Sequence, residues 1–215
     1  MNEQFVDRKG YWASFYSAES RGRSLMPPSQ FAAFVAQELE PASAIFDVGC
    51  GNGRDSLFFA EMGFKVVSLD GSKDAIRFVE EQAKERDLEN IKFIVGDIKG
   101  PKLREAIEQL ASKKVCIYAR FFLHAISEKE QEIFLETLSD NLRPGSLVAF
   151  EYRTVDDQFL QKEAPPHFRR YQSSESLKAK LQDAGFEEIY AIEGQGFAKY
   201  KMDDAIVARC IFEKV

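Results

Sequence analysis

The sequence predicts an α/β fold in which a doubly wound sheet carries helices on both faces. Two observations support this prediction. Between residues 44 and 184, apolar runs typical of buried strands alternate with amphipathic helical patterns, as in parallel βαβ units. The last two β runs have no helical pattern between them, which predicts a hairpin and therefore an antiparallel strand at the end of the sheet.

Each element follows from apolar periodicity and from the residues that start or stop a helix. Ser29 is a typical N-cap for the first helix, and Pro144 and Gly185 stand where two later helices must end. The predicted strands are 44–48, 65–69, 91–95, 114–119, 146–152, 187–193 and 205–213. The predicted helices are 30–39, 54–62, 73–86, 102–111, 127–141 and 173–184, the last capped by Ser173 or Ser174.

Length and charge bound the function. The 215 residues predict a single domain, 1–215, with an N-terminal lid and helix segment at 1–40 and a substrate loop at 153–171. The formal net charge of -6 disfavours nucleic acid and membrane surfaces as partners, because both attract an excess of Lys and Arg. The sequence leaves monomer and homodimer open.

The cysteines and the N-terminus indicate a compartment. Cys50, Cys116 and Cys210 lie in or beside apolar runs, so we expect buried free thiols and no metal site. No apolar run approaches the length of a membrane span, and the first residues lack the apolar core of a signal peptide. The expected localisation is cytoplasmic.

The stretch A-I-F-D-V-G-C-G-N-G-R-D-S, from residue 44 to residue 56, predicts a ligand site. It is a strand, a turn with Gly49, Gly51 and Gly53, and the start of a helix, and the glycines let a ligand approach the backbone closely. The spacing differs from the dinucleotide pattern G-x-G-x-x-G. Asp47 would repel a pyrophosphate and suit a cation, which favours a nucleoside with a positive centre. The alternative is that the glycines make only a tight turn.

D-V-G-C-G-N-G-R-D-S resembles the cofactor motif of class I S-adenosylmethionine-dependent methyltransferases. The resemblance implies a Rossmann-like seven-stranded sheet with an antiparallel last strand, S-adenosyl-L-methionine as cofactor and S-adenosyl-L-homocysteine as product. In that family an acid after the second strand takes the ribose hydroxyls, and a polar group after the third faces the adenine; Asp70 and Asp97 stand there. The implied cofactor residues are Asp47, Gly49, Cys50, Gly51, Asn52, Gly53, Arg54, Asp55, Asp70, Gly71, Ser72, Asp97, Ile98 and Ala119.

Two histidines and several cations are the candidates for acceptor chemistry. Arg120 leaves the fourth strand above the cofactor, and His124 follows, either as a proton acceptor or as a residue that orients the backbone. The loop after the fifth strand is either a solvated charged loop or an anion-holding pocket, since paired guanidiniums bind phosphate or carboxylate. Its candidates are Arg153, Lys162, His167, Arg169, Arg170 and Tyr171.

The N-terminal stretch holds Tyr11, Trp12, Phe15 and Tyr16, which either staple this segment to the domain or form a lid that excludes water. The final hairpin places Glu193, Tyr200, Asp204 and Arg209 at the same end, without a specific role.

A weaker resemblance concerns the acceptor. E-Y-R-T, H-F-R-R-Y and E-G-x-G-x-A-x-Y are similar to methyltransferases found with bacterial capsule and lipopolysaccharide genes, which implies polysaccharide biosynthesis. The fourth strand is followed by Y-A-R-F and not by the N-P-P-Y motif of amino-group methyltransferases, which disfavours nucleobase and glutamine methylation; the metal-dependent catechol group is disfavoured too.

The expected function is O-methylation of a small anionic acceptor, phosphorylated or carboxylated. A phosphate oxygen needs no base, whereas a hydroxyl needs His124 or His167. The alternatives are a tellurite or thiol-type methyltransferase and a cofactor-binding module without turnover.

Overall fold

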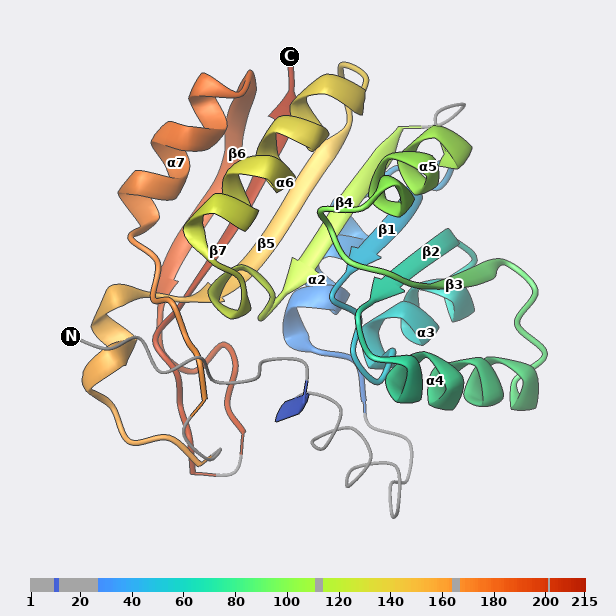
Figure 1. Ribbon diagram of the computed structural model, residues 1–215, viewed down its shortest axis with the longest axis horizontal. Coiled ribbons are helices and arrows are strands. Elements are labelled where there is room, and N and C mark those ends of the chain that lie inside the picture. The colour runs from blue at the N-terminus through green and yellow to red at the C-terminus, as the bar shows by residue number, and fades with distance from the viewer. Residues whose placement is uncertain (1–9, 12–26, 111–113, 164–166, 201) are drawn as a thin grey trace.

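The computed structural model describes residues 10–11, 27–110, 114–163, 167–200 and 202–215, and a seven-stranded sheet runs through this part of the chain (Figure 1). The strands are β1 Ala44–Val48, β2 Lys65–Asp70, β3 Ile91–Val95, β4 Val115–Arg120, β5 Leu147–Arg153, β6 Phe186–Gly194 and β7 Val207–Lys214. Their order is β3-β2-β1-β4-β5-β7-β6, and β7 runs antiparallel to both of its neighbours. This order confirms the predicted doubly wound sheet with an antiparallel last strand.

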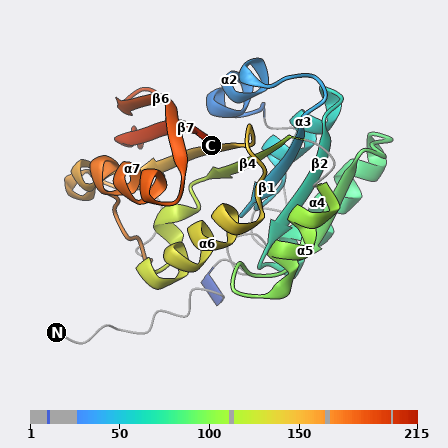
Figure 2. The same cartoon turned by 90° about the horizontal axis from the view of Figure 1, so that it is seen from above.

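Helices cover both faces of the sheet (Figure 2). They are α2 Gln30–Glu38, α3 Arg54–Glu61, α4 Lys73–Glu85, α5 Pro101–Leu110, α6 Glu128–Asn141 and α7 Ser174–Asp183. On one face, α5, α6 and α7 bury their apolar residues against the strands, and on the other α2 and α3 do so, with α4 packed beside α3. The alternation of side chains along each strand supplies both interiors; in β1, Phe46 faces the first layer and Ile45 the second.

The predicted boundaries are close to the observed ones. The largest difference is the start of β7, predicted at residue 205 and observed at Val207. Ser29 caps α2 and Ser173 caps α7, each accepting a backbone N–H of the first turn. Two short 3₁₀ turns were not predicted: η1 Leu123–Ala125 and η2 Val155–Phe159, the second inside the region expected to be a loop.

No helix within the described ranges is both long and apolar enough to cross a membrane.

Candidate active site

A cavity of about 760 Å³ opens at the carboxyl ends of the parallel strands, where ligands bind in open α/β sheets. Most of the predicted site residues line it: Asp47, Gly49, Cys50, Gly51, Asn52, Arg54, Asp55, Asp70, Gly71, Ser72, Asp97, Ile98, Arg120, His124, His167 and Arg169. Gly53, Ala119, Arg170 and Tyr171 are not among the lining residues.

The glycine turn follows β1 in left-handed backbone. Gly49 has φ 75° and Gly53 has φ 68°, a region that glycine adopts without strain. A Cβ on Gly49 would lie 2.5 Å from Phe122 Cδ2, so this glycine lets the ring of Phe122, which follows β4, pack on the turn. A Cβ on Gly53 would overlap Val79 of α4. Gly53 therefore allows close packing of α3 against α4, and it does not line the cavity.

Asp70 holds the turn in place from the end of β2. Its carboxylate accepts hydrogen bonds from the backbone N–H of Gly51 at 2.9 Å and of Ser72 at 2.7 Å. Burial raises the pKa of this carboxyl, and those backbone donors oppose the rise. Asp70 thus joins the first and second βα turns at the cavity.

Asp47 lies deep in the same half of the cavity. Ser56 Oγ of α3 donates to its carboxyl at 2.5 Å. Burial raises the pKa of Asp47 to about 8, with Asp55 and Asp70 adding to the rise. The carboxyl is therefore largely protonated at neutral pH. The sequence-based expectation of a negative charge on Asp47 that attracts a cation does not take this burial into account.

Asp55 and Cys50 also line the cavity. Asp55 has a structural role, and Cys50 has little reactivity. The Asp55 carboxylate accepts from the backbone N–H and the hydroxyl of Ser29, both at 2.8 Å, and from Tyr118 Oη at 2.8 Å, so it ties α2 and β4 to the start of α3. Burial, together with Asp70 and Asp47, raises the pKa of the Cys50 thiol well above its usual value. Cys50 is thus a thiol and not a nucleophile at neutral pH.

Arg120, Arg153 and Arg169 line the part of the cavity at the ends of β4 and β5 and in the following loop, which we call the basic half. Arg120 leaves the end of β4 and pairs with Glu151 of β5 at 2.7 Å. Arg153, at the end of β5, pairs with Asp157 and with Asp203, each at 2.7 Å. Burial opposes the charge on both guanidiniums, but these carboxylates outweigh it and raise both pKa values. Arg120 and Arg153 are therefore already paired.

Arg169 is different. Among the residues that the structure describes, no carboxylate forms an ion pair with its guanidinium, and Asp203, which does favour its charge, is already paired with Arg153. Burial and the neighbouring Arg153 lower the pKa of Arg169. A half-buried guanidinium that has no carboxylate partner in the described part of the chain is a candidate for anion binding.

The two histidines stand in this basic half. His124, in η1, is 4% exposed, and its Nδ1 has no hydrogen-bond partner in the described part of the chain. Burial lowers the pKa of His124 well below its usual value, and Arg153, Arg169, His167 and Arg120 add to the effect. His167 stacks on Tyr11 with ring centroids 4.2 Å apart, and both rings line the cavity.

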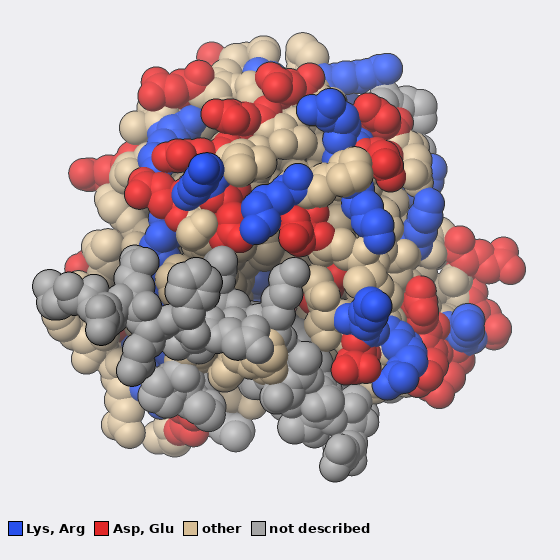
Figure 3. All heavy atoms as spheres, in the orientation of Figure 1, with Lys and Arg blue, Asp and Glu red and all other residues tan. Residues whose placement is uncertain are grey.

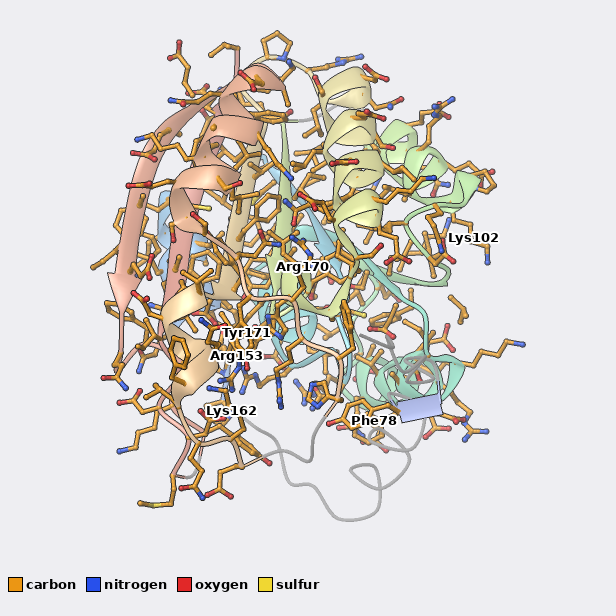
Figure 4. The ribbon with its side chains drawn as sticks, turned by 60° about the vertical axis from the view of Figure 1, so that its left-hand side comes forward. Phe78, Lys102, Arg153, Lys162, Arg170 and Tyr171 are labelled. Atoms are coloured by element: carbon orange, nitrogen blue, oxygen red, sulfur yellow. The ribbon has the colours of Figure 1, made fainter. Side chains whose placement is uncertain are left out.

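Arg170 and Tyr171 lie outside the cavity. Arg170 donates to the carbonyls of Ile126 at 3.1 Å and Leu123 at 3.3 Å, and also to Gln131 Oε1, so it fixes η1 against α6. The Tyr171 ring lies under Lys162 Nζ, 5.8 Å from its centroid, and Figure 4 shows both near Arg153, with Arg170 apart from them. The predicted acceptor-binding role of Arg170 and Tyr171 is therefore not supported by their positions.

Several cavity residues escaped prediction. Phe121 has φ 54°, a strained conformation for an aromatic residue, and its ring lies 4.4 Å from the Arg120 guanidinium carbon and 5.6 Å from that of Arg153. No local signal marks it. Asp203, in the turn before β7, was not singled out either, whereas its neighbour Tyr200, which the sequence places at this end without a role, does line the cavity. Of the aromatic N-terminal stretch only Tyr11 is described; Trp12, Phe15 and Tyr16 lie outside the described residues.

Outside the cavity, charges are mixed. On the face drawn in Figure 3, acidic and basic side chains of the described residues lie interspersed over the helices. This distribution gives no support to an extended basic surface on that face for nucleic acid.

Comparisons with known proteins identify the family of this chain. The family described as "Methyltransferase domain" matches residues 39–196. A probable (S)-tetrahydroprotoberberine N-methyltransferase 2 of Papaver bracteatum is 24% identical over 178 residues, 75% of this chain and 47% of that protein. The probable S-adenosyl-L-methionine-dependent methyltransferase TehB of Haemophilus influenzae is 32% identical over 74 residues, 34% of this chain and 26% of that protein. The chain thus spans about half the length, or less, of these curated relatives.

Solved structures share the fold. The CcbJ methyltransferase of Streptomyces caelestis superposes with a TM-score of 0.74 at 16% identity, over 98% of this chain and 100% of that one. Magnesium protoporphyrin IX methyltransferase of Synechocystis PCC 6803 with bound S-adenosylhomocysteine superposes with a TM-score of 0.70 at 14% identity, over 98% and 100%. The family match, which includes the glycine turn and Asp70, decides the assignment. The chain belongs to the methyltransferase domain family, as a class I domain that depends on S-adenosyl-L-methionine.

Proposed function

We propose that this chain transfers a methyl group from S-adenosyl-L-methionine to an oxygen atom of a small anionic acceptor. The observation that carries the proposal is Arg169, which lines the cavity and has no carboxylate ion-pair partner among the described residues. Asp70 and Asp97 line the cavity after β2 and β3, whereas Arg169 lies in the loop that follows β5. A cationic cofactor near the two carboxylates and an anionic acceptor near Arg169 would each meet the opposite charge.

The cofactor would lie beside Asp70 and the turn at Gly49 and Gly51, and these residues would hold it. When bound, it supplies an electrophilic methyl group on a sulfonium. The chain's own contribution is alignment of the acceptor and exclusion of water. Arg169 would hold the acidic group of the acceptor, and the stacked rings of Tyr11 and His167 cover this part of the cavity.

An oxygen acceptor fits the protonation states of the site. Carboxylate and phosphate oxygens are already ionised at neutral pH, so their attack on a methyl group needs no base. An amine nucleophile would need to lose a proton, and a cationic acceptor would be repelled by the uncompensated Arg169. A phosphorylated or carboxylated precursor of a surface glycan would meet these requirements, although none of the relatives named above carries such a name.

A tellurite or thiol-type methyltransferase is the second candidate, since the cofactor turn by itself does not select the acceptor. Such a small acceptor would depend less on Arg169. A cofactor-binding module without turnover is the third candidate, and it predicts no product at all.

The test measures S-adenosylhomocysteine formation from acceptors matched in size: phosphate monoesters, carboxylates, neutral alcohols and thiols. We expect product only with the anionic acceptors. Arg169→Gln should raise the acceptor KM about tenfold or more, the effect of one charge-assisted hydrogen bond, and leave cofactor affinity unchanged. Arg143→Gln, an exposed site remote from the cavity lining, is the control. Equal turnover of neutral alcohols, or an unaltered KM in Arg169→Gln, would contradict the proposal.

A further inference from the structure

His124 is a buried imidazole of the cavity with an unpartnered ring nitrogen among the described residues. It is buried, it lines the cavity, and its Nδ1 has no hydrogen-bond partner within the described residues. A buried polar nitrogen without a partner costs free energy, so it marks a place where a ligand can supply the missing contact. The backbone holds it firmly, because its carbonyl accepts the N–H of Arg170 at 2.8 Å.

Three arginines lie close enough to His124 to disfavour a charge on it. Arg120 stands at the end of β4, Arg153 at the end of β5, and Arg169 in the loop that follows, where His167 also lies. The ring of Phe121 meets the imidazole edge-on at 5.4 Å. A proton on His124 would stand among these positive charges, which makes the imidazole a poor general base by itself.

An anion reverses this situation. A negative group bound by Arg169 would lie among the same cations and would stabilise a proton on His124. We propose that His124 is a ligand of the acceptor's acidic group and takes up one proton from solvent as that group binds, so that acceptor binding is coupled to protonation. The imidazole gains a proton and donates a hydrogen bond to an acceptor oxygen. This inference rests on the proposed function and assigns His124 to acceptor binding instead of to base catalysis.

The coupling has a measurable sign. If one proton is taken up, affinity for the anion rises as pH falls, by up to about tenfold per pH unit. The effect is confined to pH values above the pKa of free His124 and below that of the anion-bound form. A His124 that only orients the backbone, or that acts as a base, would give no proton uptake on anion binding.

The test uses sulfate and acetate as probes, with S-adenosylhomocysteine present, because neither probe titrates near neutral pH. Calorimetric titration in two buffers of different ionisation enthalpy counts the protons taken up. We expect wild type to take up close to one proton per anion near about pH 6 and almost none above about pH 8.5. Tighter binding of sulfate would indicate a phosphate-type acceptor, and tighter binding of acetate a carboxylate.

Two matched variants localise the proton. His124→Gln should bind the preferred anion about tenfold more weakly near pH 6, without proton uptake, whereas His167→Gln should retain the uptake. The chain has only these two histidines, so the ring resonances of wild type report each imidazole directly even if a variant fails to fold. Anion binding with no protonation of His124, or with uptake that is lost only in His167→Gln, would overturn this inference and leave the proposed function standing. Failure of wild type to bind either anion would contradict the anionic acceptor itself.

Discussion

Arg120 and Glu151 form a buried ion pair, with Arg120 Nε 2.7 Å from Glu151 Oε1. The second Glu151 oxygen accepts Arg209 Nε at 2.6 Å, and the Glu151 side chain is 0% exposed. The three residues are register partners across β4, β5 and β7. One carboxylate therefore links three neighbouring strands beneath the basic half of the cavity, and Arg120 is held by the fold before any acceptor arrives.

We expect Glu151→Gln to lower the free energy of unfolding by about 3 kcal/mol, because it leaves the buried Arg209 and the partly buried Arg120 without their counter-charge. Urea denaturation measures this. Glu188→Gln, which breaks the more exposed pair with Lys178 at 3.0 Å, is the control and should cost less than about 1 kcal/mol. Equal effects of the two substitutions would show that the Glu151 link is not important for stability.

Asp70→Asn should weaken binding of both S-adenosylmethionine and S-adenosylhomocysteine. The amide keeps the size of the side chain but loses the charge, and it offers the N–H groups of Gly51 and Ser72 only one acceptor oxygen. We expect a loss of about tenfold or more in affinity by calorimetric titration. Glu81→Gln, on the exposed surface of α4, should leave affinity unchanged. Wild-type affinity in Asp70→Asn would contradict the placement of the cofactor at this turn.

Asp47 predicts an unusual dependence of stability on pH. Its carboxyl ionises near 3.8 in the unfolded chain but near 8 in the folded protein, so between these values the folded state binds one more proton. Stability must then fall as pH rises through this window, by up to about 1.4 kcal/mol per pH unit. In Asp47→Asn, the fall in the free energy of unfolding that Asp47 causes between about pH 5 and about pH 8 should disappear, as measured by urea denaturation.

Ser56→Ala tests the same carboxyl from its partner. The Ser56 hydroxyl favours the charged form of Asp47, so its loss should extend the falling part of the stability profile to higher pH. A profile that is identical in wild type and Asp47→Asn would mean that Asp47 ionises normally in the folded protein.

The sequence predicts some parts of this site well because their signals are local. Apolar runs and the glycine turn lie within single βα units, so the strands and the placement of Asp70 follow from short stretches of chain. Arg169 and Arg170 show where local reasoning ends. They are adjacent, yet one lines the cavity and the other donates to carbonyls of η1 and its neighbour. Only the path of the loop decides between them, because successive side chains of extended backbone point in opposite directions.

Pairings between residues far apart in the sequence could not be predicted from local patterns either. Arg153 and Asp203 are 50 residues apart, and their pairing depends on how the turn before β7 folds back over the end of β5. Without that pairing, Arg153 and Arg169 look equivalent as anion ligands. Because Asp203 pairs with Arg153, only Arg169 of these two arginines lacks a carboxylate partner among the described residues. The structure therefore distinguishes Arg169 as the candidate anion ligand.

Gly53 gives a final prediction, because its role in packing is separable from its backbone conformation. Gly53 and Gly63 both have left-handed backbone, with φ 68° and φ 89°. A Cβ at Gly53 would lie 2.8 Å from Val79 Cβ, whereas a Cβ at Gly63 would meet nothing within 4 Å. Gly63→Ala should therefore cost about 1 kcal/mol of stability for the backbone alone, and Gly53→Ala about 3 kcal/mol because α4 must also shift. Equal losses in urea denaturation would show that α3 and α4 adjust freely, and that close packing is not the reason for a glycine at position 53.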